Sequence, residues 1–227
     1  MMSRSLGITI AIAVALLGFS ALITRHEASA AAVSIAPPVV DDALAAQSGQ
    51  KSLVLAGGCF WGMQLVYEHV RGVISATDGY SGGSGDTAQY ETVSTGTTGH
   101  AESVKIVYDP SKISYGRLLQ VFFSVAHDPT ELNYQGPDEG TQYRSVIFYS
   151  DADQHRIAQA YIAQIDQQHV YKDKIVTQVV PLQAFFQAEA YHQDYAKRNP
   201  DSTYIMMCDL PKLDNLKKKL PDLYVAN

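Results

Sequence analysis

The residue with the clearest chemistry in this sequence is Cys59, which directly follows Gly57-Gly58. The apolar run over 52–56 predicts a short strand, and the two glycines predict a tight turn after it. Apolar residues then recur at helical spacing, which predicts a helix that begins beside the cysteine. Unpaired N–H groups at a helix start favour a thiolate, and such sites lower a thiol pKa from roughly 8.5 to about 3.5–7.5. We therefore expect Cys59 to be a nucleophile; the alternative is a buried core cysteine.

Glu102 is the second candidate, because it shares one side of a predicted strand with Val104, Ile106 and Tyr108. A carboxyl group on an apolar face tends to keep its proton, since burial disfavours the charged form. Such an acid beside a thiol could donate a proton to a substrate oxygen. The alternative is an ordinary solvated charge on a strand.

His100 could suggest a different chemistry, because His-x-Glu also opens the zinc deaminase signature. That signature requires a Pro-Cys-x-x-Cys motif, and the two cysteines of this chain, Cys59 and Cys208, do not form one. The seven histidines show no zinc-ligand spacing either. We expect no metal, and we interpret His100 as a loop residue that orients its neighbours.

The elements that must position these residues alternate loosely between strands and helices. Further along the chain we expect a long polar loop over 79–99, a helix over 118–126 stopped by His127-Asp128-Pro129, a strand over 143–149, a helix capped by Asp151, a strand over 174–180 and helices over 189–197 and 213–220. This pattern predicts an α+β fold, an α/β two-layer sandwich in which helices pack against one mixed sheet and long loops carry function.

The first 30 residues have the order of a secretory signal peptide. Arg4 precedes an apolar run over 6–23, and Ala28-Ser29-Ala30 supplies small residues for cleavage. We expect cleavage after Ala30 and a periplasmic or secreted protein that is not stably inserted in a membrane. An uncleaved membrane anchor is the alternative, since the apolar run approaches the length that spans a bilayer.

Composition and charge limit the partners of the remaining chain. We predict a flexible leader over 31–51, which contains Pro37-Pro38, and a single catalytic domain with its C-terminal tail over 52–223. Without residues 1–30 the chain has 15 Lys and Arg against 22 Asp and Glu, a formal net charge of −7. Nucleic acid and anionic lipid bind clustered Lys and Arg, so neither is an expected partner. We expect a monomer.

Four segments, in this order, resemble the signatures of the A-type peptide methionine sulfoxide reductases. They are Gly58-Cys59-Phe60-Trp61-Gly62, Gly99-His100-Ala101-Glu102, the run DEGTQYRS over 138–145, and Tyr191-His192-Gln193-Asp194-Tyr195. The resemblance extends over about residues 52–199. One such segment is moderate evidence, and four in register are strong evidence.

The resemblance implies a role for each matching residue. Cys59 would attack the sulfur of a methionine S-sulfoxide, free or in oxidised proteins, and become a sulfenic acid, while Glu102 would protonate the sulfoxide oxygen. The remaining roles would be hydrogen bonds to that oxygen from Tyr90 and Tyr143, support of the oxygen site by Asp138, and enclosure of the substrate methyl group by Phe60 and Trp61.

The C-terminal tail departs from many members of that family, which carry resolving cysteines in a glycine-rich tail. Here Cys208 lies in an apolar segment, so it is either an inert packed thiol or the residue that resolves Cys59 by thiol exchange. Both routes need an external reductant, because the oxidised sulfur must be reduced for turnover. The resemblance implies a thioredoxin-like or glutaredoxin-like partner and no bound cofactor.

Two other functions compete with this interpretation. A cysteine hydrolase or acyltransferase would use Cys59 with a histidine base and would turn over without a reductant. An exported binding domain would contain Cys59 and Cys208 only as a structural disulfide.

Overall fold

The computed structural model describes residues 35–226, so the predicted signal peptide lies outside the described residues. The strands are β1 (Lys51–Ala56), β2 (Val73–Ser81), β3 (Ala101–Tyr108), β4 (Tyr134–Gln135), β5 (Asp138–Glu139), β6 (Val146–Tyr149), β7 (Gln178–Pro181) and β8 (Phe186–Gln187). The α-helices are α1 (Phe60–Glu68), α2 (Tyr90–Val93), α3 (Tyr115–Val121), α4 (Ala152–Gln167), α5 (Tyr195–Arg198) and α6 (Leu210–Lys219). Short π-helical segments follow α3, over Phe122–Ala126, and precede α6, over Ile205–Asp209.

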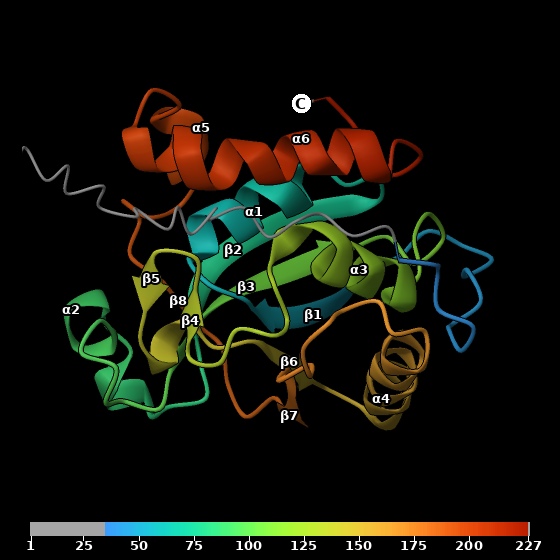
Figure 1. The fold of residues 1–227 in the computed structure, drawn as a ribbon, viewed down its shortest axis with the longest axis horizontal. Helices are drawn as coiled ribbons and strands as arrows, with labels where there is room; N and C mark the ends of the chain where they lie inside the picture. Colours follow the sequence, from blue (N-terminus) through green and yellow to red (C-terminus); the bar gives the residue numbers. More distant parts are fainter. Residues whose placement is uncertain (1–34, 227) are drawn as a thin grey trace, which may run out of the picture.

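One mixed sheet forms the centre of the molecule, with the strand order β7-β6-β1-β3-β2-β8. The pair β6–β7 is parallel, and the other neighbours in this sheet are antiparallel. Helix α1 lies between the sheet and α6, and α4 packs beside β6 and β7 (Figure 1). This arrangement confirms the predicted α+β fold.

The alternation of side chains along β1 shows why helices cover one face of the sheet. Leu53 and Leu55 enter the main core with the apolar sides of the helices, whereas Val54 and Ala56 enter a smaller cluster on the other face. In β3, the predicted inward set is confirmed: Glu102 is 3% exposed and the apolar residues that share its face are also buried. The sheet therefore presents Glu102 to the layer that contains α1.

Several element boundaries differ from the sequence-based expectation. The segment 73–81 forms the strand β2, which was not predicted, because Ser75, Thr77 and Asp78 interrupt its apolar pattern. The predicted loop over 79–99 therefore begins with the end of β2, and it also contains the helix α2. Asp151 caps α4 as predicted, since its side chain accepts a hydrogen bond from the backbone N–H of Gln154 at 2.8 Å.

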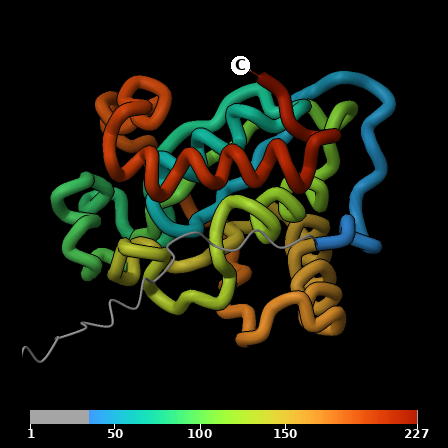
Figure 2. The backbone as a smooth tube through the Cα atoms, turned by 45° about the horizontal axis from the view of Figure 1, so that its top comes forward, coloured from blue at the N-terminus to red at the C-terminus, as the bar shows by residue number. Residues whose placement is uncertain are grey.

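Residues 35–50 pack against the domain, which differs from the flexible leader predicted for this segment (Figure 2). Ile35 is 3% exposed, and its carbonyl accepts a hydrogen bond from Gln120 at 2.6 Å. Asp41 accepts hydrogen bonds from Ser114 and from the backbone N–H of Gly116, at 2.5 and 2.8 Å. These bonds order a proline-containing segment whose composition gives no sign of them. Among the helices within residues 35–226, none combines the length and the apolar character needed to cross a membrane.

Candidate active site

The turn between β1 and α1 places Cys59 at the start of the helix, as the sequence predicts. Gly58 has a φ of +90°, and a Cβ atom there would lie 2.5 Å from the side chain of Gln135. A Cβ atom at Gly57 would lie 2.8 Å from the ring of His127. The two glycines are thus required because two side chains from distant segments pack directly against the turn.

The first turn of α1 holds the sulfur of Cys59 and the carboxyl of Glu102 side by side. The backbone N–H of Phe60 donates a hydrogen bond to Glu102 Oε2 at 3.1 Å, and the backbone N–H of Trp61 donates to the sulfur. Neighbouring N–H groups of one helical turn therefore bind the two predicted reactive groups. Both side chains are buried, with exposed fractions of 8% and 3%.

Burial is the main influence on the ionisation of both groups. It raises the pKa of Glu102 from 4.5 to about 8, although the hydrogen bond from Phe60 acts in the opposite direction. It also raises the pKa of the Cys59 thiol well above its ordinary value, and the negative charges of Glu102, Asp209 and Asp138 raise it further. The lowered thiol pKa expected from the helix start is therefore wrong for this structure. The helix contributes a hydrogen bond from Trp61, but burial and nearby carboxyls outweigh it.

The structure gathers Tyr143, Tyr90 and Asp138 around this pair. Burial raises the pKa of the Tyr143 hydroxyl, and the charges of Glu102 and Asp138 raise it further. Burial also raises the pKa of Tyr90, followed by the charge of Glu102. The carboxyl of Asp138 accepts a hydrogen bond from Tyr204 at 2.5 Å, while burial raises its pKa. Hydroxyl donors thus face the acid and the sulfur from α2 and from the turn before β6.

Aromatic rings form one wall of the site. Trp61 stacks on Tyr195 with ring centres 3.8 Å apart and meets Tyr204 edge-on at 6.0 Å. Phe60 is 1% exposed, and its ring packs against His192 at 4.9 Å. Phe60 therefore supports the wall from the core, while Trp61 remains partly exposed.

Cys208 lies in the π-helical segment before α6, and both cysteines are free thiols. Cys208 is partly exposed, and burial raises its pKa, as does the charge of Asp209. A structural Cys59–Cys208 disulfide is therefore absent from the described residues.

Sequence reasoning missed Tyr204, His192 and Asp209 as parts of the site. Tyr204 binds Asp138, and His192 contacts Trp61 and Tyr90. Asp209 is fully buried against Gly62 of α1, where a Cβ atom would lie 2.1 Å from its carboxyl oxygen. The Tyr191–Tyr195 segment contains the signal for His192, whereas nothing in the sequence around Tyr204 distinguishes it from the other tyrosines.

His100 is 1% exposed and joins two loops, as expected of a residue that orients its neighbours. Its Nδ1 accepts a hydrogen bond from Gly83 at 3.2 Å, and its Nε2 lies 2.9 Å from the carbonyl of Ser84. Within residues 35–226, no three His, Cys, Asp or Glu side chains are grouped in a way that could hold a metal ion.

Comparison with known proteins assigns the chain to a family. The family model for peptide methionine sulfoxide reductase matches residues 51–223, and the chain belongs to this family. Its relatives define the type as A. "Peptide methionine sulfoxide reductase MsrA 2" of Mesorhizobium japonicum is 56% identical over 79% of this chain and 92% of its own. The protein of the same name from Synechocystis is 48% identical over 83% of this chain and 89% of its own.

Solved structures agree with the assignment of the fold. The structure of Mxr1 from Saccharomyces cerevisiae in reduced form matches with a TM-score of 0.61 and 32% identity, over 73% of this chain and 97% of that one. Methionine sulfoxide reductase A of Corynebacterium diphtheriae matches with a TM-score of 0.58 and 32% identity, over 68% and 77% of the two chains.

Proposed function

We propose that this enzyme reduces methionine sulfoxide to methionine with Cys59 as the oxygen acceptor and Glu102 as the proton donor. The family membership makes the chain an oxidoreductase of the MsrA type. The observation that carries the residue roles is the first turn of α1, which holds a thiol and a protonated carboxyl on adjacent N–H groups. The charged groups that act on the pKa of Cys59 are carboxyls. These neighbours favour a mechanism with an acid beside the sulfur over one with a histidine base.

The two proposed reacting groups are neutral at pH 7. Glu102, with a pKa of about 8, keeps its proton, and the raised pKa of Cys59 keeps the thiol un-ionised. This neutrality favours the entry of an uncharged sulfoxide, because neither reacting group has to be desolvated as an ion. Attack then depends on proton transfer during the reaction rather than on a thiolate formed beforehand.

The proposed reaction balances without an outside proton. Glu102 protonates the sulfoxide oxygen, whose position Tyr90 and Tyr143 fix by hydrogen bonds, while the sulfur of Cys59 attacks the substrate sulfur. The oxygen passes to Cys59 as a sulfenic acid, the substrate leaves as a thioether, and the proton released by the thiol returns to Glu102. The thiol sulfur has then lost two electrons and the substrate sulfur has gained two.

Regeneration needs a thiol reductant. Two reducing thiols convert the sulfenic acid to the thiol, giving a disulfide and one water. We propose a thioredoxin-like or glutaredoxin-like protein as their source. Cys208 either forms a disulfide with Cys59 first or takes no part, and both routes consume the same reductant.

We also propose that the protein is exported after cleavage behind Ala30, as a monomer with oxidised proteins or free methionine sulfoxide as substrates. The support is the order of basic, apolar and small residues at the start of the sequence. The intact mass of protein secreted by a bacterial host checks this proposal. A chain that begins at Ala31 is expected, and a chain that keeps its apolar run would contradict it.

Separate assays with the S and R epimers of methionine sulfoxide and dithiothreitol test the reaction. We expect turnover of the S epimer, a dimedone adduct on Cys59 after one turnover without reductant, and loss of both in Cys59→Ser. Equal rates on the two epimers would contradict the assigned specificity.

A Cys208→Ser variant tests the role of the second cysteine. If this variant still turns over with dithiothreitol but accumulates more dimedone adduct on Cys59, Cys208 is the resolving thiol.

A further inference from the structure

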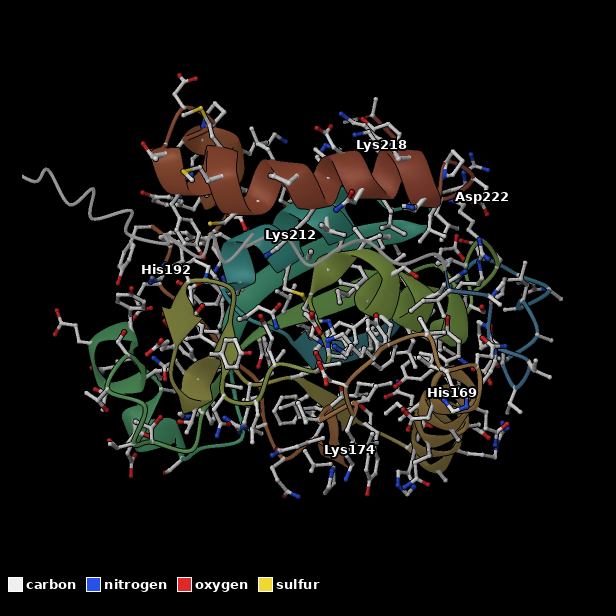
Figure 3. The ribbon with its side chains drawn as sticks, in the orientation of Figure 1. His169, Lys174, His192, Lys212, Lys218 and Asp222 are labelled. Carbon is white, nitrogen blue, oxygen red and sulfur yellow. The ribbon has the colours of Figure 1, made fainter. Side chains whose placement is uncertain are left out.

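His192 lies in the left half of the molecule in Figure 3 and is held in one tautomer by Trp61. The indole Nε1 lies 3.2 Å from His192 Nδ1. An indole can only donate, so Nδ1 must be the unprotonated acceptor and the ring proton must be on Nε2. Burial lowers the pKa of His192, which keeps the ring neutral in this tautomer.

Glu189 lies behind this imidazole and binds other parts of the site. One carboxylate oxygen accepts the backbone N–H of Tyr90 at 2.9 Å, and the other accepts the hydroxyl of Tyr80 at 2.8 Å. The second oxygen is 3.9 Å from Nε2 of His192, the ring nitrogen that carries the proton. Burial alone would raise the pKa of Glu189, but hydrogen bonds from the Tyr90 N–H, from its own backbone and from the Tyr80 hydroxyl hold it below its ordinary value.

The geometry points to Glu189 as a positioning residue that fixes two walls of the substrate pocket at once, directly at Tyr90 and through His192 at Trp61. The inference rests on the proposed roles of Tyr90 and Trp61 in binding the sulfoxide. The two walls come from α2 and from α1, and His192 packs between them, with ring centres 4.5 Å from Tyr90 and 5.8 Å from Trp61. One carboxylate therefore sets the spacing between the hydroxyl that would bind the oxygen and the indole that would enclose the methyl group.

A carboxylate suits this position better than an amide. Two donors from different segments reach its two oxygens, whereas an amide would have to reverse the hydrogen bond to the Tyr80 hydroxyl. The carboxylate also places negative charge opposite the protonated Nε2 of His192, which favours the tautomer that leaves Nδ1 free for Trp61. Gln in place of Glu189 can still accept the Tyr90 N–H and can donate its amide N–H to the Tyr80 oxygen, so it chiefly removes the negative charge that faces His192.

The first test separates the hydrogen bond from the packing of the ring. His192→Phe keeps a ring and removes the acceptor, whereas His192→Asn places an amide oxygen close to the position of Nδ1. Trp61 is the only tryptophan in the chain, so its fluorescence reports on this contact directly. We expect His192→Phe to shift the Trp61 emission and to raise KM for methionine sulfoxide roughly fivefold, the value of one ordinary hydrogen bond. His192→Asn should restore both.

The second test addresses Glu189 itself, with Glu91→Gln as the matched control, because Glu91 is exposed on the same helix as Tyr90. Glu189→Gln should shift the Trp61 emission and lower kcat/KM, while Glu91→Gln should leave both unchanged. Thermal unfolding of each variant shows whether the fold is retained.

The outcomes distinguish this inference from the proposed site. Wild-type emission and KM in His192→Phe, or a Glu189→Gln variant that matches Glu91→Gln, would overturn the positioning role. Trp61→Phe with an unchanged KM would instead remove Trp61 from the substrate pocket, which is a failure of the proposed site. In that case the Trp61 emission of the His192→Phe and Glu189→Gln variants, which keep the tryptophan, would still test the positioning role of Glu189.

Discussion

Two buried carboxyl groups, Glu102 on β3 and Asp78 on β2, lie on the same face of neighbouring strands but differ in what surrounds them. Tyr80 pairs with Glu102 across the strands, and Asp78 pairs with Val104, which places both acids beneath α1. Glu102 receives the N–H of Phe60, whereas neither oxygen of Asp78 has a hydrogen-bond partner among the described residues.

Burial raises the pKa of both acids, and for Glu102 it raises the pKa to about 8. Only Glu102 lies at the helix start that also holds the sulfur. The comparison teaches that burial is sufficient to raise the pKa of a carboxyl group, but that the helix start is needed to make that acid useful to a reaction.

The largest expected effect separates the two acids by activity. Glu102→Gln keeps an acceptor for Phe60 but has no proton to give, so kcat should fall by about 10²- to 10⁴-fold, the usual contribution of a general acid. Asp78→Asn should leave kcat close to that of the wild type. Single-turnover reduction of methionine sulfoxide measures both. Equal losses in the two variants would remove the distinction on which the comparison depends.

The next effect is on the pH dependence of stability, where the two acids should behave alike. Between pH 4.5, the ordinary pKa of Glu102, and its folded value of about 8, the native state holds a proton that the unfolded state has lost. The stabilisation linked to this proton is complete below that window and is lost as the pH rises through it, at about 1.4 kcal/mol per pH unit for each such group. Glu102→Gln and Asp78→Asn should each make the fall in the free energy of unfolding less steep.

Urea unfolding at several pH values between these limits measures the slope. Glu91→Gln is the control, because that side chain is exposed on α2. A slope unchanged in Asp78→Asn would show that Asp78 is already ionised in the folded protein.

A third buried acid, Asp209, tests how tightly its surroundings are packed. Lys212 extends from α6 and lies 3.3 Å from its carboxyl oxygen (Figure 3). A methyl group at Gly62 would collide with that carboxyl, so Gly62→Ala should destabilise the protein by about 1–3 kcal/mol. Gly49→Ala is the matched control, because a Cβ atom there meets nothing within 4 Å. Equal melting temperatures for the two variants would show that α6 can move away from α1.

The smallest expected effect is a shift in the titration of the thiol. The negative charge of Glu102 raises the pKa of Cys59, so Glu102→Gln should lower it. Rates of alkylation by iodoacetamide across the alkaline range, with Cys208→Ser in both proteins, give the two titration curves. A higher thiol pKa in Glu102→Gln would contradict the electrostatic part of this account.

The part of the site that the sequence predicts well is local. The glycine turn, the start of α1 and the inward face of β3 follow from spacing alone, and they bring Cys59 and Glu102 together. Only the resemblance predicts Tyr90 and Tyr143, because nothing in their immediate sequence distinguishes them from the other tyrosines.

The part that sequence reasoning missed is made by long-range contacts. The raised pKa of Cys59 comes mainly from burial, with further contributions from Glu102, Asp209 and Asp138, and these groups surround the sulfur only in the folded protein. The strand β2 was missed because Ser75, Thr77 and Asp78 interrupt its apolar pattern, and the order of residues 35–50 depends on bonds to α3 and α4. Spacing along the chain contains no information about such contacts.

The packed segment 35–50 also determines the geometry of any attachment made through it. It lies on the opposite side of the molecule from α2 and β5, which carry Tyr90 and Asp138 (Figures 1 and 2). A solid support or a fused carrier protein joined at this segment would leave the side that contains α2 and β5 directed outward. Immobilised enzyme coupled in this orientation should therefore still admit large oxidised proteins.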